Sequence, residues 1–327
     1  MKKTIARRNR LGIALVSLIA AGCMGGGADE QAVDEQAVDE YSAAIDESVA
    51  AAALPRVGAF ARTTASVALR SGPDAASPSL QVLPANAKVF VHTGPHNTTW
   101  FEVGFNGVRG FVDGGFLAPG RAAVVRKLPT TAQIAALTFD AGSDRGFAGQ
   151  ILDTLAAEGV PGSFGITGRW AEANPDLVRR MADEGHMIFN HTYSHRSFTG
   201  FSTGAAPLTY DERAVELWKT HKPILDIAGV SSKPFFRPPF GDQDTGVLED
   251  VWSRGYDFSL MWSCDSLGWR GLSADEIVAR VISFLEPGAI YLFHVGSSSQ
   301  DGPALSDIIA ELRGRGYRFE RVSTFFD

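Results

Sequence analysis

The chain has 327 residues, 45% of them hydrophobic, and a formal net charge of −7. This length and composition are sufficient for two globular domains, and they exclude both a disordered chain and a multi-span membrane protein. The acidic balance argues against nucleic acid as a partner.

The first 23 residues have the features of an export signal. Five basic side chains precede an apolar run at 11–21, which is too short to span a bilayer because a transmembrane helix needs about 20 residues. Residues 18–23 resemble the end of a bacterial lipoprotein signal, with Cys23 as the residue that would carry the lipid. Ala20 stands where that pattern prefers leucine, so secretion without an anchor is the alternative. We expect an exported protein, either an envelope lipoprotein whose only membrane contact is its lipid or a secreted protein.

Residues 24–55 are small, acidic and repetitive. The sequence Asp-Glu-Gln-Ala-Val occurs at 29–33 and again at 34–38, and the segment holds eight acidic residues and no basic one. Few large apolar side chains and a high charge favour a solvated, self-repelling tether.

Short alternating apolar runs, separated by turn residues, fill residues 56–120. The runs lie at 66–70, 88–92, 100–103 and 110–112. Asn106-Gly107 is a typical two-residue hairpin turn, and the pattern predicts a small β barrel. The runs at 69–73 and 83–84, together with Trp100 and 110–112, resemble the bacterial SH3-type domain of cell-wall enzymes. That resemblance implies wall binding, with a spacer that binds no ligand as the alternative.

After a link at 121–129, strand-like and helix-like segments alternate, and the second domain is expected at 125–327. This alternation predicts a mainly parallel sheet of about seven strands. Helices are expected at 147–158, 174–184, 210–228, 245–254, 273–285 and 304–313. Strands are expected at 134–139, 163–167, 187–189, 235–236, 256–262, 289–293 and 317–322.

Two histidines follow one of these strands with a spacing typical of a metal site. His191 and His195 are four residues apart, and two imidazoles at i and i+4 on a helical turn can grip one metal ion. The alternative is a pair of surface histidines that bind nothing.

Three other strands end in side chains that carry chemistry. Asp140 follows the first strand, Arg237 follows the strand at 235–236, and His294 follows the strand at 289–293. Buried strands that deliver such side chains at their carboxyl ends are how α/β barrels build active sites.

Together these motifs resemble those of the NodB-type polysaccharide deacetylases, carbohydrate esterases with a distorted (β/α) barrel that remove acetyl groups with a divalent metal ion. The matching positions are Asp140 for the base of the family's TFDDG motif, His191 and His195 for its HxxxH metal pair, 237–241 for its arginine-proline motif, and His294 for its leucine-x-histidine motif. The resemblance covers about residues 125–327. It implies an α/β fold of this type after the SH3-like barrel, and one divalent metal ion as cofactor, with zinc expected.

The resemblance also implies a role for each residue. Asp140 would take a proton from water, His294 would donate one to the departing sugar amine, and the backbone N–H of Phe240 would bind the oxyanion. Because a guanidinium can clamp a carboxylate in two-point geometry, we expect Arg237 to hold Asp140 ionised. The alternative is that Arg237, which precedes two prolines, is a surface residue at a turn.

The chain departs from the family at two positions. Ala141 stands where the family has a metal-binding carboxylate, and we expect Asp144 to replace that ligand, with a helix cap as the alternative role. Gly268 stands where the family's DxxDW motif has the aspartate that tunes the catalytic histidine. Asp265 is the expected substitute, and Trp269 is expected to line the sugar groove or to pack in the core.

Two functions of different class follow from these observations. The first is a metal-dependent hydrolase that removes N-acetyl groups from peptidoglycan amino sugars and releases acetate, with chitin oligomers or O-acetylated xylan as alternative substrates. The second is a wall-binding protein with an inactive deacetylase-like domain, an interpretation motivated by Ala141 and Gly268.

Overall fold

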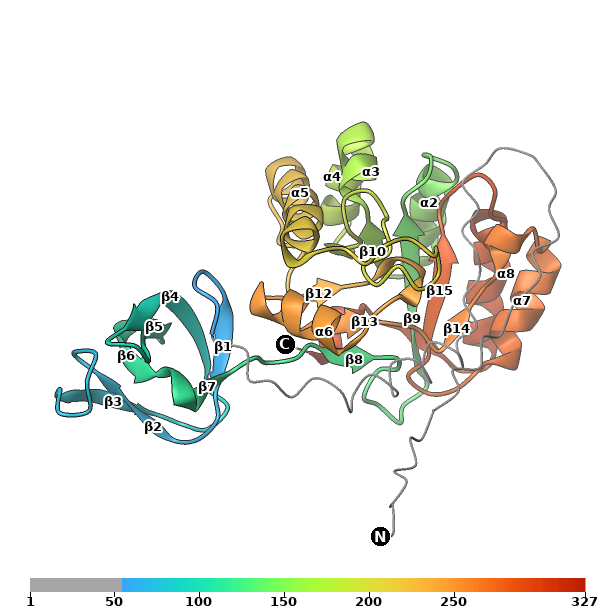
Figure 1. Cartoon of the computed structure of the whole chain (residues 1–327). Coiled ribbons are helices and arrows are strands. Elements are labelled where there is room, and N and C mark those ends of the chain that lie inside the picture. The colour runs from blue at the N-terminus through green and yellow to red at the C-terminus, as the bar shows by residue number, and fades with distance from the viewer. Residues whose placement is uncertain (1–54, 327) are drawn as a thin grey trace, which may run out of the picture. The chain divides into compact units, whose positions relative to one another are not determined.

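The computed structural model describes residues 55–326, which form an all-β part and a larger α/β part (Figure 1). The predicted export signal and almost all of the predicted tether lie outside the described residues. Between residues 55 and 326, none of the helices has the length and apolar character needed to cross a membrane.

The all-β part is a seven-stranded antiparallel sheet in the order β3-β2-β6-β5-β4-β1-β7. Asn106 and Gly107 join β5 to β6 with φ values of 47° and 80°, and Phe105 pairs with Val108, so the predicted hairpin turn is confirmed. The expected SH3-like fold is confirmed as well, and it has three strands more than the four apolar runs. The strands are β1 (Phe60–Thr63), β2 (Val67–Arg70), β3 (Ser79–Leu83), β4 (Lys88–His96), β5 (Trp100–Phe105), β6 (Val108–Asp113) and β7 (Leu117–Ala118), with the short 3₁₀ helix η1 (Gly114–Phe116) before β7.

The α/β part is built on a curled parallel sheet in the order β14-β15-β9-β10-β11-β12-β13-β8, with β16 beside β9. The predicted parallel sheet and distorted barrel are confirmed. The predicted link at 121–129 is wrong in part, because it contains β8, which pairs in parallel with β13. The strands are β8 (Ala123–Val125), β9 (Ile134–Ala141), β10 (Gly162–Ile166), β11 (Met187–Asn190), β12 (Phe235–Phe236), β13 (Phe258–Leu260), β14 (Cys264–Asp265), β15 (Ile290–His294) and β16 (Arg318–Phe319).

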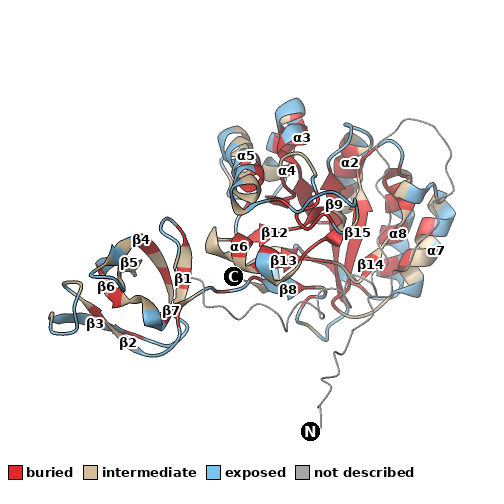
Figure 2. Cartoon of the chain, viewed as in Figure 1, coloured by how far each residue is buried: buried red, intermediate tan, exposed pale blue. Residues whose placement is uncertain are grey.

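Helices cover this sheet, with buried inner faces and exposed outer faces (Figure 2). Helix α5 has its predicted bounds, because Thr209 and Glu212 form a capping box at its start and Gly229, with φ 69°, ends it. Helix α8 begins earlier than predicted, at Asp301. The helices are α2 (Ala148–Glu158), α3 (Gly168–Ala173), α4 (Pro175–Asp183), α5 (Tyr210–Ala228), α6 (Thr245–Ser253), α7 (Ala274–Ser283) and α8 (Asp301–Gly314), with 3₁₀ turns η2 (Pro239–Gly241), η3 (Gly268–Arg270) and η4 (Val322–Phe325).

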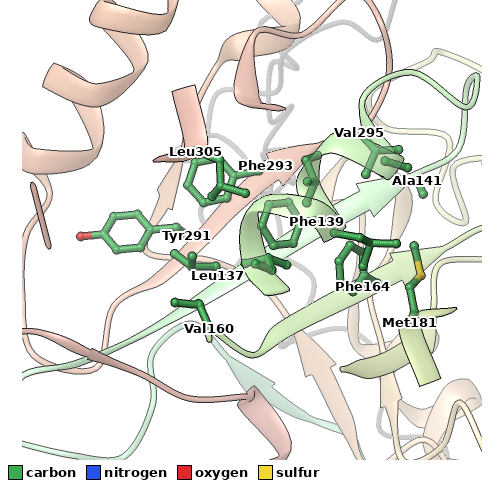
Figure 3. Close-up of a cluster of buried hydrophobic side chains, with 14 of the residues drawn as sticks. Leu137, Phe139, Ala141, Val160, Phe164, Met181, Tyr291, Phe293, Val295 and Leu305 are labelled. Carbon is green, nitrogen blue, oxygen red and sulfur yellow. The ribbon is translucent and has the colours of Figure 1, made fainter. Parts of the chain in front are cut away.

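Strand β9 is buried along its whole length, and its two faces have different surroundings. Phe139 joins the cluster beneath the helices, where its ring stacks on Phe164 and Phe293 with centroids 5.1 and 5.5 Å apart (Figure 3). Because side chains alternate along a strand, Thr138 and Asp140 face the opposite side. Phe139 therefore anchors the strand that presents Asp140, and truncating such a ring to alanine costs about 3–5 kcal/mol.

Candidate active site

Parallel pairing brings the predicted strand-end residues to one edge of the sheet. β15 pairs with β9 so that His294 lies beside Asp140. β11 pairs with β12 at Asn190 and Phe236, so the histidine turn and Arg237 directly follow neighbouring strands. The arrangement that places catalytic groups at the carboxyl ends of parallel strands is therefore present.

Arg237 is fully buried and holds the Asp140 carboxylate. Its Nη1 donates to Asp140 Oδ1 at 2.6 Å, while Nη2 donates to Thr138 Oγ1 at 2.9 Å. The expected two-point clamp is thus a single bond, because the other nitrogens of the guanidinium bind elsewhere. Burial alone would raise the pKa of Asp140, but the charge of Arg237, followed by those of His191 and His294, holds that pKa below its ordinary value. The surface alternative for Arg237 is wrong.

His191 and His195 meet in a turn after β11, and not on a helix as expected. Their ring centroids lie 4.9 Å apart, and Thr192 and His195 have φ values of 63° and 59°. Nδ1 of His191 donates to the Arg237 carbonyl at 2.9 Å, so the neutral ring carries its lone pair on Nε2. That Nε2 lies 3.3 Å from Asp140 Oδ2. Two such acceptor atoms face each other favourably only when a cation or a proton lies between them.

Glu216, on α5, fixes this turn and was missed in the sequence. Its Oε2 accepts hydrogen bonds from the backbone N–H groups of Tyr193 and Ser194 at 2.9 and 2.8 Å, and its Oε1 accepts one from the Ser194 hydroxyl at 2.6 Å. A signal was present, because Glu216 shares the buried helix face of Thr220 and Ile224, where a carboxylate needs partners.

Phe240 lies in η2 with φ 62°, a strained conformation for a residue other than glycine. Its ring packs edge-on against His195, with the centroids 4.8 Å apart. Two residues further on, the Asp242 carboxylate accepts hydrogen bonds from the Ser197 and Ser202 hydroxyls. These contacts fix the backbone of the segment to which the family resemblance assigns the oxyanion donor.

Asp144 does not join the two histidines. Its carboxylate accepts hydrogen bonds from the hydroxyl of Ser297 and from its backbone N–H, the latter at 2.9 Å, and the bond from the hydroxyl is the main cause that lowers the pKa of Asp144. Within residues 55–326, no group of three His, Cys, Asp or Glu side chains is placed to hold a metal ion. In this structure Asp144 is therefore not placed as the third ligand beside His191 and His195. The helix-cap alternative is wrong, because α2 has no side-chain cap. Asp144 instead ties the loop after β9 to the loop after β15.

The residues that remain still provide donors of the kind that a divalent metal ion binds. His191 and His195 offer imidazole nitrogens, and the lone pair of His191 Nε2 points toward the carboxylate of Asp140. Imidazole nitrogen suits zinc and several other transition metals. His191 and His195 can therefore hold such an ion next to the ionised carboxylate of Asp140.

His294 is flanked by an indole ring and by two acidic side chains. The Trp269 ring lies edge-on to it with centroids 6.5 Å apart. The expected partner, Asp265, uses its two oxygens for the Leu267 backbone N–H at 2.9 Å and for Trp269 Nε1 at 3.2 Å. Burial raises the pKa of Asp265, an effect that the charge of His294 partly offsets. Asp265 therefore fixes the position of Trp269 beside His294. Asp301, which no sequence motif indicates, accepts a hydrogen bond from the His294 backbone N–H at 2.7 Å.

Comparisons with known proteins agree with this geometry. The family model described as polysaccharide deacetylase matches residues 127–259, and the bacterial SH3 domain model matches 65–118. The chain is 36% identical over 197 residues to a peptidoglycan-N-acetylglucosamine deacetylase of Bacillus cereus, which covers 58% of this chain and 67% of that relative. It is 32% identical over 189 residues to the peptidoglycan-N-acetylmuramic acid deacetylase PdaA of Bacillus subtilis, with 57% and 68% covered. The crystal structure of a CE4 family pseudoenzyme from Bacillus anthracis is also similar, with a TM-score of 0.56, 25% identity, and 66% and 72% of the two chains covered.

The matches extend over most of the α/β part. The range matched by the deacetylase model includes Asp140, both histidines, Arg237 and Phe240. His294 lies beyond that range, and the pairing of β15 with β9 places it beside Asp140. The chain therefore belongs to the polysaccharide deacetylase family.

Proposed function

We propose that this protein is a metal-dependent hydrolase that removes N-acetyl groups from the amino sugars of peptidoglycan and releases acetate. The observation that carries the proposal is the pairing of Asp140, held by Arg237, with His294 on the neighbouring strand. Relatives named for peptidoglycan N-acetylglucosamine and N-acetylmuramic acid resemble the same part of the chain. These relatives favour peptidoglycan over chitin oligomers and O-acetylated xylan.

Each residue of the site has a step that suits its surroundings. Asp140, kept ionised by Arg237, accepts a proton from the attacking water. The backbone N–H of Phe240 stabilises the negative charge that forms on the acetyl oxygen. His294 then donates a proton to the amine nitrogen, so the C–N bond breaks and acetate is released. A divalent metal ion bound by His191 and His195 would polarise the acetyl carbonyl and lower the pKa of water.

The proposal also includes the identity of the metal, the location of the protein and the role of the SH3-like part. Zinc is the metal favoured by a pair of imidazole donors. Export, with a lipid anchor on Cys23, is supported by the sequence of the first 23 residues. The SH3-like part would bind the cell wall and keep the hydrolase near its substrate.

A second function is favoured by two specific departures. Ala141 and Gly268 replace carboxylates of the family motifs, and one structural relative is named as a pseudoenzyme. On this alternative, the protein binds acetylated wall glycan without hydrolysing it.

Acetate release separates the two functions. Purified protein loaded with zinc would be incubated with peptidoglycan fragments and with N-acetylglucosamine oligomers, with and without a chelator, beside Asp140→Asn. We expect acetate from the peptidoglycan fragments, loss of activity with the chelator, and recovery when zinc is added back. Binding of wall fragments without acetate release by any metal form would support the second function.

A further inference from the structure

Asp301 lies against His294 from a fully buried position at the start of α8. Its Oδ2 accepts a hydrogen bond from the His294 backbone N–H at 2.7 Å and lies 3.8 Å from Nδ1 of the same residue. Its other oxygen, Oδ1, has no hydrogen-bond partner within the described part of the chain. A buried carboxylate with an unused acceptor is unfavourable unless a positive charge lies close to it, and a protonated His294 would supply that charge.

Gly268 leaves the space that Asp301 fills. A Cβ atom at position 268 would lie 2.7 Å from Asp301 Oδ1 and would also overlap the Ser299 hydroxyl. Gly268 does not have a left-handed φ, so the backbone does not require glycine at this position. The neighbouring side chains require it. The family motif has an aspartate at this position, where this chain has Gly268. The carboxylate of Asp301, from α8, lies in the space that a side chain at position 268 would need.

We propose that Asp301 is the positioning residue for His294, in place of the carboxylate that Gly268 lacks. This inference rests on the proposed function, in which His294 donates a proton to the departing amine. Asp301 holds the Nδ1 side of the ring, so Nε2, on the opposite side, is directed toward the substrate.

The other charged groups that face His294 are already engaged. Asp140 is bound by Arg237, and Asp265 binds Leu267 and Trp269. Asp301 also lies in the first turn of α8, where the helix dipole stabilises a carboxylate.

The separation of 3.8 Å is an ion-pair distance and is longer than a hydrogen bond. Catalytic hydrogen bonds are often long without substrate and shorten in the complex, so the distance is compatible with a positioning role. On this interpretation the Asp301 to Nδ1 contact shortens when His294 carries the proton.

The first test is Asp301→Asn in the full chain, which keeps the shape of the side chain and removes its charge. We expect kcat for peptidoglycan fragments to fall about 10- to 100-fold with KM nearly unchanged, as for other residues that orient a catalytic ring. Because a carboxylate favours the protonated ring, its loss should move the basic limb of the kcat profile to lower pH. Asp307→Asn, an exposed position on the same helix, is the matched control and should behave as the parent protein.

The second test moves the carboxylate back to position 268. Ser299→Ala with Asp301→Ala should be as slow as Asp301→Asn. Adding Gly268→Asp to that pair should raise kcat about tenfold, because the removed side chains leave room for the new one. In the parent background, Gly268→Asp alone should lower kcat, since the new side chain would overlap Asp301.

NMR titration of the His294 ring gives a readout that does not depend on activity. We expect a lower midpoint in Asp301→Asn than in the parent protein, even if no substrate is hydrolysed. An unchanged midpoint, or an active parent whose kcat changes by less than about twofold on Asp301→Asn, would overturn the role of Asp301. An inactive parent with a lowered midpoint in the variant would overturn the proposed hydrolysis and leave the Asp301 contact in place.

Discussion

The Arg237 guanidinium and the Asp140 carboxylate form an ion pair, with Nη1 2.6 Å from Oδ1, in which Arg237 is fully buried and Asp140 is 7% exposed. A pair with so little access to water is sensitive to the loss of either partner, because the remaining charge cannot be solvated. The same pair keeps Asp140 ionised, the form that accepts a proton in the proposed mechanism. On that mechanism, stability and catalysis both depend on one contact.

Arg237→Met should destabilise the protein by about 3–5 kcal/mol at neutral pH, since it leaves a buried carboxylate without its counter-charge. Arg237→Met combined with Asp140→Asn should recover most of this loss, because the double variant buries no charge. The measurement is the free energy of unfolding from chemical denaturation. Arg145→Met, which breaks the exposed Arg145–Asp176 pair, is the matched control and should have little effect.

The effect of pH on the free energy of unfolding should have opposite signs in the parent protein and in Arg237→Met. In the parent protein the folded pKa of Asp140 is below its unfolded value, so its stabilising contribution is complete above about pH 4 and is lost as the pH falls through the folded pKa. In Arg237→Met, burial acts without the arginine and raises the folded pKa above the unfolded value. The variant should therefore regain stability relative to the parent between pH 7 and pH 5. If the difference in free energy of unfolding between the two proteins stays constant over this range, the pKa of Asp140 does not depend on Arg237.

Asp140→Asn and His294→Ala should each lower kcat about 10²- to 10⁴-fold, the usual effect of removing a positioned acid or base. His294→Ala should fold and bind zinc as the parent does. Asp140→Asn should stay folded with lower stability, because it leaves Arg237 buried without its counter-charge, and its rate is compared at equal metal loading. Initial rates of acetate release, with metal content measured on the same samples, test this prediction. Activity retained in either variant would remove that residue from the mechanism.

Glu216→Ala should weaken zinc binding about 10- to 100-fold, the usual effect of removing a residue that orients metal ligands. The turn that carries both histidines has left-handed backbone at Thr192 and His195, and the Glu216 carboxylate binds the two N–H groups between them. Asp226→Ala, an exposed position on the same helix, is the matched control. Competition with a zinc chelator on the folded proteins gives the affinities. Equal affinity of Glu216→Ala and the parent would mean that the turn keeps its shape without the carboxylate.

The sequence was most informative where one local rule decides the structure. Helix α5 could be placed from its capping box and its terminal glycine. The strand-end residues could be grouped because parallel strands align their carboxyl ends. Asp301 was not found because the apolar pattern of α8 begins at Ala304, so the three residues before it resembled a loop. Whether Asp144 reaches a histidine or Ser297 depends on how two loops 153 residues apart pack together, which no local pattern contains.

Asp144 joins the loop after β9 to Ser297, and this contact determines whether its carboxylate can bind metal. Asp144→Ala should bind zinc as tightly as the parent protein, because the carboxylate is bonded to Ser297 and lies outside any metal-binding group among the described residues. His195→Ala should bind zinc more weakly, since it removes one of two imidazole donors. Isothermal titration with zinc, together with metal analysis of the purified proteins, compares the variants directly. If Asp144→Ala loses zinc as His195→Ala does, the loop after β9 must turn its carboxylate toward the histidines when the metal binds. If it keeps zinc, Asp144 serves to join two loops at the rim of the site. Ser297→Ala should then reproduce the part of its effects that comes from the hydroxyl bond, since the backbone N–H of residue 297 still donates to Asp144.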